Sequence, residues 1–344
     1  MTSVWTLDRE LSDRWDAYVR SHPDSSIFHT LEWRRTIAET FGHEAVYLIA
    51  ERRGEVVGVL PMFVVRSPFF GPSLCSTPFA VYGGILASDT ESSEALARAA
   101  RQEARVRGIR KVELRHMKPS GLDFPTVDSY ATFFAPVPDT VPGCLERIPR
   151  KARAEVRKAL AKPGLSVDFD SKDVADFHRL FAENKRDLGS LVFPEALFWR
   201  TFEVMGDKCL MTRVRWEGET VASVVSFVWN GVIMPYWSGA SERAERLSAN
   251  NVLYHAVMEE ACRRGLRSFD FGRSRKDTGA FRFKHNQGFE PTTLHYQWIL
   301  LDDSAIPRIS PDNPRLRWVR EAFRNLPMPI ARKLGAFVSS RIPV

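Results

Sequence analysis

"LYHAVMEEACRRGLRSFDF" (253–271) repeats the pattern of an earlier stretch, "LARAARQEARVRGIRKVEL" (96–114), with seven identities in nineteen aligned positions. Leu253, Ala256, Val257 and Ala261 fall at helical spacing on one face. A glycine then follows at 108 or 265, where a helix commonly ends. The residues beyond the glycine alternate between apolar and polar, which predicts a strand. Each segment therefore predicts a helix, a glycine stop and a strand.

A second pair of segments repeats in the same order. "ERRGEVVGVLPMFVV" (51–65) aligns with "RWEGETVASVVSFVW" (215–229) at five identical positions in fifteen. Both predict a hairpin, with turns at Arg53-Gly54 and Glu217-Gly218. Each half also opens with a helical segment, "LEWRRTIAETF" (31–41) or "VADFHRLFAENKRDLG" (174–189).

The preserved order predicts a duplicated α/β domain. Two unrelated α/β domains that share a common unit, or chance similarity between amphipathic elements, are the alternatives. The expected bounds are 1–138 and 139–303 for the two domains, followed by a basic amphipathic tail, 304–344.

Composition places the chain among globular proteins. It has 344 residues, 44% of them hydrophobic and 26% charged, which suits two domains of ordinary size. No apolar run is long enough to span a bilayer and the N-terminus lacks the features of a signal peptide, so we expect a cytoplasmic protein. The four cysteines are scattered singly, and we expect neither a metal site nor a disulfide. The net charge is +7, and residues 312–344 hold seven basic and two acidic residues.

The stretch "FDFGRSRKDTGAFRFKHNQGFEP" (269–291) is the candidate for chemistry. It begins as a strand and is expected to break at Gly272 into a glycine-punctuated loop rich in basic residues. Glycines allow backbone N–H groups to approach a ligand closely, which explains their place beside cations.

Several motifs resemble the FemAB family, which adds amino acids to peptidoglycan precursors. The resemblance covers nearly the whole chain. Its motifs are "RKARAEVRKALAKPGLSV" (150–167), "ENKRDLGSLVFP" (183–194), "YWSGASERAERLSANNVLYHAVMEEACRRGLRSFDFGRS" (236–274) and "FRFKHNQGFEP" (281–291). With the tail "LPMPIARKLG" (326–335), the chain looks most like the branch associated with exosortase and PEP-CTERM systems. The resemblance implies two tandem acetyltransferase-like (GNAT) folds and acyl transfer to an amine, with the acyl carbonyl lying where the sheet splays apart.

Two residues are candidates for catalysis. The resemblance implies that Lys284, in a Phe-Lys pair, reaches the acyl donor or its phosphates; the alternative is an ordinary surface lysine. Asp270 is either an acid that orients a basic partner or accepts a proton, or a solvent-facing residue on an alternating strand. Glu113 holds the equivalent position in the first repeat, which favours a structural role for Asp270.

Further residues are candidates for binding donor or substrate. Arg273 and Arg275 either bind phosphates or solvate the loop. The segment "ENKRDLG" either binds the acceptor, as the resemblance implies, or simply ends a helix with Gly189 as its cap. The basic helix at 150–162 is either a solvated linker or a phosphate-binding element. The complete set of binding candidates is Arg273, Arg275, Phe283, Tyr236, Ser238, Arg243, Asn250, Asn184, Arg186 and Asp187.

The turn at 238–251 precedes a predicted helix, whose N-terminus is a natural anion site. It lacks the glycine pair with which acetyl-CoA-dependent GNAT enzymes seat a pyrophosphate. This departure favours an aminoacyl-tRNA as co-substrate, without excluding acyl-CoA, and we expect no tightly bound cofactor.

The leading hypothesis is a transferase acting on an amine of a cell-envelope or exopolysaccharide precursor. The alternatives are an acyl-CoA-dependent N-acyltransferase and a non-catalytic scaffold of polysaccharide assembly. In the tail, Leu316, Val319, Phe323 and Leu326 lie at helical spacing, with a second amphipathic piece at 330–338. These apolar faces pack on the body of the protein or, with their basic neighbours, contact the inner membrane through residues 312–344.

Overall fold

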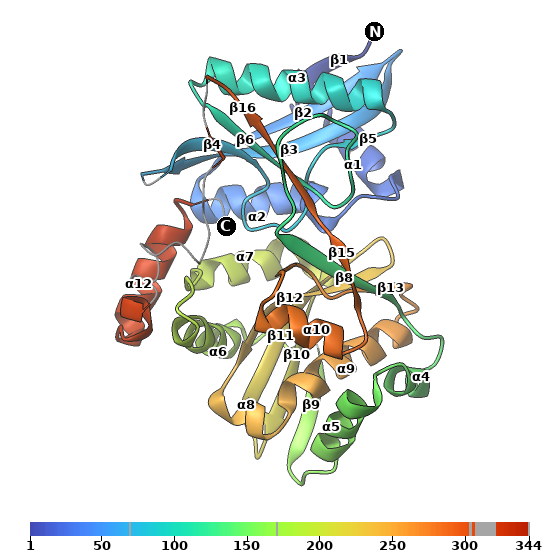
Figure 1. Ribbon diagram of the computed structural model, residues 1–344, viewed down its shortest axis with the longest axis vertical. Coiled ribbons are helices and arrows are strands. Elements are labelled where there is room, and N and C mark those ends of the chain that lie inside the picture. Colours follow the sequence, from blue (N-terminus) through green and yellow to red (C-terminus); the bar gives the residue numbers. More distant parts are fainter. Residues whose placement is uncertain (69, 170, 303–304, 307–320, 343–344) are drawn as a thin grey trace. The chain divides into compact units, whose positions relative to one another are not determined.

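The computed structural model describes residues 1–68, 70–169, 171–302, 305–306 and 321–342. The chain forms two compact units. Unit 1 is built on Met1–Tyr130 together with the strand β16, and unit 2 on Ala131–Thr292. Both contain a mixed sheet with helices on its two faces (Figure 1).

Unit 1 has an eight-stranded sheet in the order β1-β2-β3-β4-β6-β16-β7, with β5 paired to β3. Helix α3 packs on one face through Leu96, Ala97 and Ala100. Helices α1 and α2 contact β3 and β2. The elements are β1 Ser3–Thr6, α1 Ser12–Ser21, α2 Leu31–Phe41, β2 Glu44–Arg52, β3 Glu55–Ser67, β4 Gly71–Ser76, β5 Leu86–Ala87, α3 Thr90–Val106, β6 Lys111–His116, β7 Thr126–Val127 and β16 His295–Leu300.

Unit 2 has a second eight-stranded sheet in the order β14-β8-β13-β12-β11-β10-β9, with β15 paired to β8. Helix α9 packs on β10 and β11, and α6 and α7 pack on β12 and β10. The elements are β8 Tyr130–Pro136, α4 Val141–Glu146, α5 Arg150–Leu160, β9 Leu165–Phe169, α6 Val174–Asp187, α7 Glu195–Met205, β10 Cys209–Trp216, β11 Glu219–Trp229, β12 Val232–Ala240, α8 Glu242–Arg246, α9 Ala249–Arg263, β13 Ser268–Asp270, β14 Ser274–Arg275, α10 Gly279–Asn286 and β15 Glu290–Thr293.

The repeated segments form the same elements in both units, as predicted. Both hairpin turns have left-handed backbone at their two central residues, with φ of 53° and 84° at Arg53-Gly54 and 50° and 84° at Glu217-Gly218. This geometry suits the right-handed twist of the flanking strands. Both helix-to-strand glycines, Gly108 and Gly265, also adopt positive φ, 64° and 65°. Gly189, for which a helix cap was one of two expected roles, adopts a φ of 64° just after α6.

Two strands lie in the sheet formed by the other half of the chain. β8 follows the first repeat in the chain but pairs antiparallel with β13, where Phe269 is opposite Ala135. β16 follows the second repeat but pairs antiparallel with β6, where Gln297 is opposite Leu114. The compact units are therefore not continuous in the chain. The expected domain bounds at 138 and 303 assume that they are.

The C-terminal helix α12, Met328–Ser339, matches the second amphipathic piece of the predicted tail. Phe323 and Ala331 are buried against Ala182 and Val192, with Leu326 packed alongside. The part of the predicted face at Leu316 and Val319 lies outside the described residues. The described part of the tail thus packs on the body of the protein, which was one of the two expectations for it. Among the described residues no helix is both long and apolar enough to cross a membrane.

Candidate functional site

The sheet of unit 2 opens between β12 and β13. These parallel strands pair only at Val232 and Ile233, although β12 continues to Ala240. Next to the opening, β12 contains a bulge, because Val225 is opposite Trp237 whereas Ser226 is opposite Pro235. Tyr236 is the extra residue. A bulge takes backbone groups out of the ladder and re-aims them, so this part of β12 can present polar groups to a ligand.

Lys284 lies beside the end of β13, on α10. The segment expected to be a loop contains this helix, because Thr278 caps it by accepting a hydrogen bond from Phe281 N at 3.3 Å. Lys284 Nζ donates to the carbonyl oxygens of Gly272 at 2.8 Å and Arg273 at 3.1 Å. It also lies over the ring of Phe271, 5.4 Å from its centroid. Lys284 is therefore held in place and is not an ordinary surface lysine.

The environment of Lys284 favours its neutral form. The pKa of Lys284 is lowered to about 7, chiefly by burial; the charge of Asp270 opposes this shift and that of Arg273 adds to it. Burial disfavours a charged ammonium because a protein interior solvates it poorly. Near neutral pH this side chain can both accept and release a proton.

Asp270 is buried, with 1% of its surface exposed, so the expectation of a solvent-facing side chain is wrong. Its Oδ1 accepts hydrogen bonds from Thr132 Oγ1 at 2.9 Å and from Gly272 N at 2.8 Å. Because Gly272 O accepts from Lys284, the carboxylate fixes the backbone that holds the lysine. Thr132 was missed by sequence reasoning, because β8 lies in the other half of the chain and no motif marks it.

An aromatic cluster lies around the same place. The Tyr254 hydroxyl donates to Ser238 Oγ at 3.3 Å, and its ring centroid lies 4.5 Å from that of Phe271 and 5.8 Å from that of Phe283. Burial raises the pKa of Tyr254, so its hydroxyl stays protonated. The structure thus brings together the predicted residues Lys284, Asp270, Arg273, Phe283 and Ser238, and adds Thr132 and Tyr254. Arg275, on β14, is two residues beyond Arg273 in the same segment.

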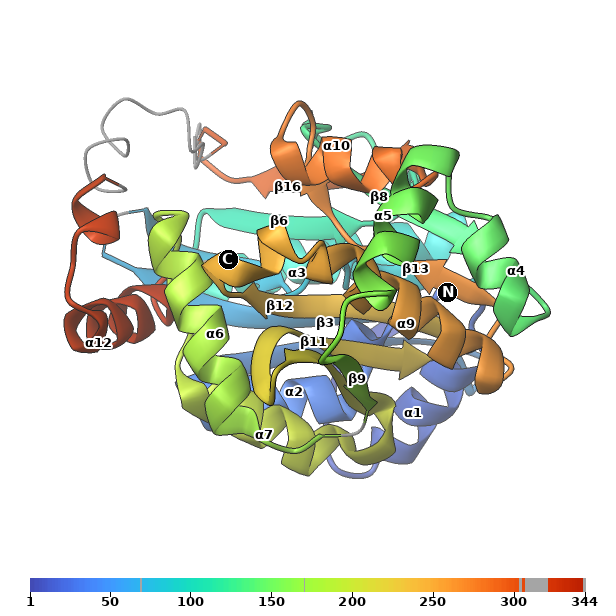
Figure 2. The ribbon, with the colours of Figure 1, turned by 90° about the horizontal axis from the view of Figure 1, so that it is seen from below.

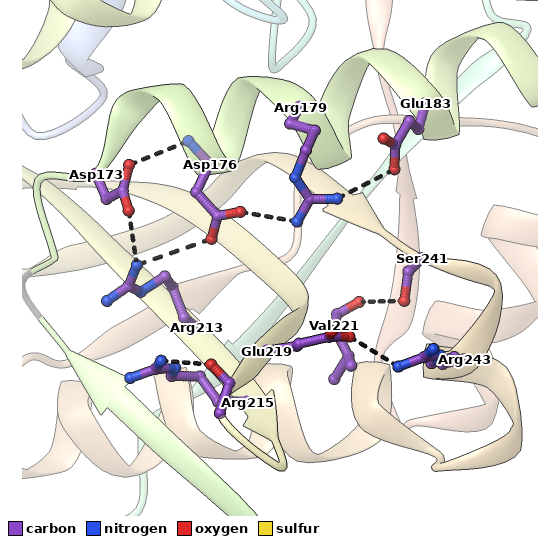
Figure 3. Close-up of polar contacts among 11 residues, drawn as sticks. Asp173, Asp176, Arg179, Glu183, Arg213, Arg215, Glu219, Val221, Ser241 and Arg243 are labelled. Atoms are coloured by element: carbon purple, nitrogen blue, oxygen red, sulfur yellow. Dashed lines mark hydrogen bonds and ion pairs between the residues drawn. The ribbon is translucent and has the colours of Figure 1, made fainter.

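A separate cleft of about 680 Å³ lies between α6, the β10–β11 hairpin and the residues after β12 (Figure 3). Its lining includes three predicted residues, Arg186, Asp187 and Arg243. Arg243 pairs with Glu219 at 2.7 Å, and Arg179 pairs with Asp176 at 2.8 Å. The cleft is therefore polar, and much of its charge is already neutralised within the protein. Asn184 on α6 and Asn250 on α9 do not line it.

A carboxylate from α5 lies at the turn before α9. Ser248, which precedes the helix with φ of 53°, donates from Oγ to Glu155 Oε2 at 2.8 Å. A carboxylate at a helix N-terminus is favoured by the helix dipole. Glu155 thus places negative charge where a pyrophosphate would otherwise gain from the same dipole.

The equivalent place in unit 1 is filled by its own chain. Beyond β4, residues 77–84 are buried. Arg115, 2% exposed, donates to Thr77 O at 3.0 Å and to Ala80 O at 2.6 Å, and pairs with Glu113 at 3.1 Å. The open sheet with Lys284 beside it is accordingly a feature of unit 2, whereas unit 1 fills the equivalent place with residues 77–84. Within the described residues, no group of three His, Cys, Asp or Glu side chains could hold a metal ion.

Comparison with known proteins agrees with this geometry. The profile of the acetyltransferase (GNAT) domain matches residues 147–285, which lie within the part of the chain that forms unit 2. Among solved structures, FemX is 15% identical with a TM-score of 0.68, over 92% of this chain and 100% of FemX. A tandem GNAT protein from the clavulanic acid biosynthesis pathway is 14% identical with a TM-score of 0.54, over 89% and 100%.

A third solved structure is the C-terminal domain of a putative lysylphosphatidylglycerol synthetase from Agrobacterium fabrum. It is 14% identical with a TM-score of 0.52, over 84% of this chain and 91% of that one. No curated protein matches the sequence. The structural likenesses confirm the predicted tandem GNAT fold.

Proposed function

We propose that unit 2 transfers an acyl or aminoacyl group from an activated donor to an amine, with Lys284 as the general base. The observation that carries this proposal is the position of Lys284 Nζ. This nitrogen donates hydrogen bonds to two carbonyl oxygens beside the open end of β13, in an environment that lowers the pKa of Lys284 to about 7.

The chemistry follows from the hydrogens of Nζ. A neutral lysine has two N–H groups and one lone pair, and both N–H groups are donated to Gly272 and Arg273. The lone pair then takes a proton from the acceptor ammonium. The freed amine attacks the acyl carbonyl carbon and a tetrahedral oxyanion forms. The bond to the leaving oxygen or sulfur then breaks as that atom takes the proton held by Lys284, and the new amide nitrogen releases its extra proton to solvent. A positioned base of this kind contributes about 10²–10⁴-fold in rate.

For the donor we propose an aminoacyl-tRNA. The carboxylate of Glu155 at the start of α9 disfavours a pyrophosphate there, and the turn lacks a glycine pair. The fold is shared with FemX and with the lysylphosphatidylglycerol synthetase domain, which is consistent with aminoacyl chemistry. An acyl-CoA donor is the second candidate. This candidate is favoured by the match to the acetyltransferase (GNAT) profile and by the structural likeness to the tandem GNAT protein of the clavulanic acid pathway.

For the acceptor we propose an amine of a cell-envelope or exopolysaccharide precursor, in line with the exosortase and PEP-CTERM branch that the motifs resemble. A lipid-linked acceptor would require the enzyme to work at the inner membrane. α12 exposes Ile330 and Leu334, with Lys333 exposed beside them. These side chains support a peripheral membrane contact of the tail.

The test is a transfer assay in which aminoacyl-tRNA and acyl-CoA pools are each offered with amino-sugar and lipid-linked acceptors. Lys284→Ala should lower the transfer rate about tenfold or more, which is about 1.4 kcal/mol of transition-state stabilisation. His285→Ala, at the exposed neighbouring position on α10, is the matched control and should keep full activity. Unimpaired turnover in Lys284→Ala would reject the assignment of the base. Absence of transfer with every donor would favour a scaffold.

A further inference from the structure

The outer face of α5 is a surface of single-sign charge. Arg150, Lys151, Arg157 and Lys158 are all exposed; we call these four residues the α5 basic face. The buried side of the helix is formed by Ala152, Val156 and Ala159. At about 100° per residue, Arg150 and Arg157 form one row and Lys151 and Lys158 form the next. Both rows point away from the buried side. Figure 2 shows α5 beside α9, on which it packs.

The four cations have no acidic partner. Across the part of the chain that the structure describes, none of their side chains forms an ion pair or a hydrogen bond. Other arginines of unit 2 are paired, for example Arg213 with Asp168 and Arg263 with Glu259. The one acid of α5, Glu155, is turned to Ser248 instead. A helix face needs charge for solubility, but it does not need charge of one sign without partners.

The placement of two of these cations also works against the helix. Arg150 and Lys151 lie in the first turn of α5, which has no acidic residue. A cation near a helix N-terminus is unfavourable by about 0.3–1 kcal/mol, because the dipole is positive there. Arg153, by contrast, has a local role and donates to Glu146 O at 2.9 Å. Arg150 and Lys151 therefore weaken the start of the helix, whereas Arg157 and Lys158 lie in its last turn, where the dipole favours cations. A bound polyanion would offset the cost of the first pair.

The spacing and the surroundings indicate the kind of anion. Residues seven apart on a helix are separated by about 10.5 Å along its axis, so one phosphate group cannot contact both ends of the α5 basic face. A helix that docks on a bilayer needs an apolar face, and α5 exposes only one large apolar side chain, Leu160. The phosphodiester backbone of a nucleic acid, with regularly repeated charges, fits this surface better than a lipid headgroup layer.

α5 is joined directly to the turn before α9, the helix that carries Tyr254 of the candidate site. Lys162 Nζ donates to Arg246 O at 2.7 Å, and Glu155 accepts from Ser248 at 2.8 Å. We infer that the α5 basic face binds the phosphodiester backbone of an RNA whose acylated end lies at the site of unit 2. The choice of RNA rests on the proposed aminoacyl-tRNA donor, whereas the binding of a nucleic-acid backbone rests on the face itself.

The test is binding of fluorescein-labelled, unacylated tRNA to the full-length protein, followed by anisotropy between about 50 and 200 mM salt. Each neutralised phosphate adds about 0.7–0.9 to the slope of log affinity against log salt. Replacing all four residues of the α5 basic face with Ser should therefore reduce this slope by about 3 and weaken binding at least about tenfold. The control replaces Arg9, Arg53, Arg105 and Lys172, which are also exposed, and removes the same net charge.

Tight, salt-sensitive binding that is lost only in the α5 variant supports the inference. It is overturned if the wild type does not bind tRNA at low salt, if both variants lose affinity equally, or if anionic phosphatidylglycerol vesicles bind in place of tRNA. Circular dichroism of the α5 variant checks that the helix persists. Because unacylated tRNA is used and no turnover is measured, failure here is separate from failure of Lys284 in the transfer assay.

Discussion

Replacing Lys284 with Met should change how the stability of the protein depends on pH. Burial lowers the pKa of Lys284 from its ordinary 10.5 to about 7. Between these values the unfolded chain binds a proton that the folded chain does not. The stability of the wild type therefore rises with pH across this window, and below pH 7 the full cost of burying the charge is present. Lys284→Met has no proton to bind at this position.

The expected size follows from the pKa. Each pH unit of the window corresponds to about 1.4 kcal/mol, so the upper limit is about 5 kcal/mol. Solvent still reaches part of the side chain and screens its charge, so we expect about 2 kcal/mol between about pH 7 and pH 9.5. Loss of the hydrogen bonds to Gly272 and Arg273 should destabilise the variant by about 0.5–1.5 kcal/mol each, at every pH.

The assay is urea unfolding of both proteins at a series of pH values. All other groups titrate alike in the two proteins, so the difference between their free energies of unfolding isolates Lys284. That difference should grow in favour of the wild type as pH rises. If it stays constant within about 0.5 kcal/mol, Lys284 remains charged into the alkaline range and cannot be the base at neutral pH.

Three further predictions concern the turn before α9, a close packing contact and the tail. Isothermal titration should find no saturable acetyl-CoA binding below millimolar concentration, and a micromolar dissociation constant would promote the acyl-CoA candidate. Gly239→Ala should destabilise the protein by about 3 kcal/mol or more in thermal unfolding, because a Cβ there would lie 2.4 Å from Phe181 N; Gly279→Ala, with nothing within 4 Å, should change stability little. Co-sedimentation with anionic vesicles at low salt should require residues 312–344. If the intact protein stays in the supernatant, the tail has only a structural role.

The elements of the fold were predictable because their signals are local. Hairpin turns, helix stops and amphipathic spacing depend on neighbouring residues, and the turns at Arg53-Gly54 and Glu217-Gly218 adopt the backbone that their residue types favour. α10 was missed because glycines and cations hid a short helix, although Thr278 three residues before Phe281 is a capping signal.

The site was less predictable because its contacts join distant segments. Asp270 lies on a short alternating strand, which suggested exposure, but β8 covers it with Thr132. Nothing near residue 132 indicates that this strand pairs with β13. Likewise, the filling of the opening in unit 1 depends on Arg115 and on carbonyls of residues 77–84, a contact that amphipathic spacing does not reveal.

The exchange of β8 and β16 sets the order in which the protein can be completed during synthesis. β16 lies between β6 and β7 in the sheet of unit 1. While a ribosome is still translating the second repeat, β6 therefore has an open edge, and it keeps that edge until residues 295–300 emerge. Open edges are templates for pairing with other chains. A nascent or prematurely terminated chain is then the form most prone to aggregate, and the one that depends most on chaperones.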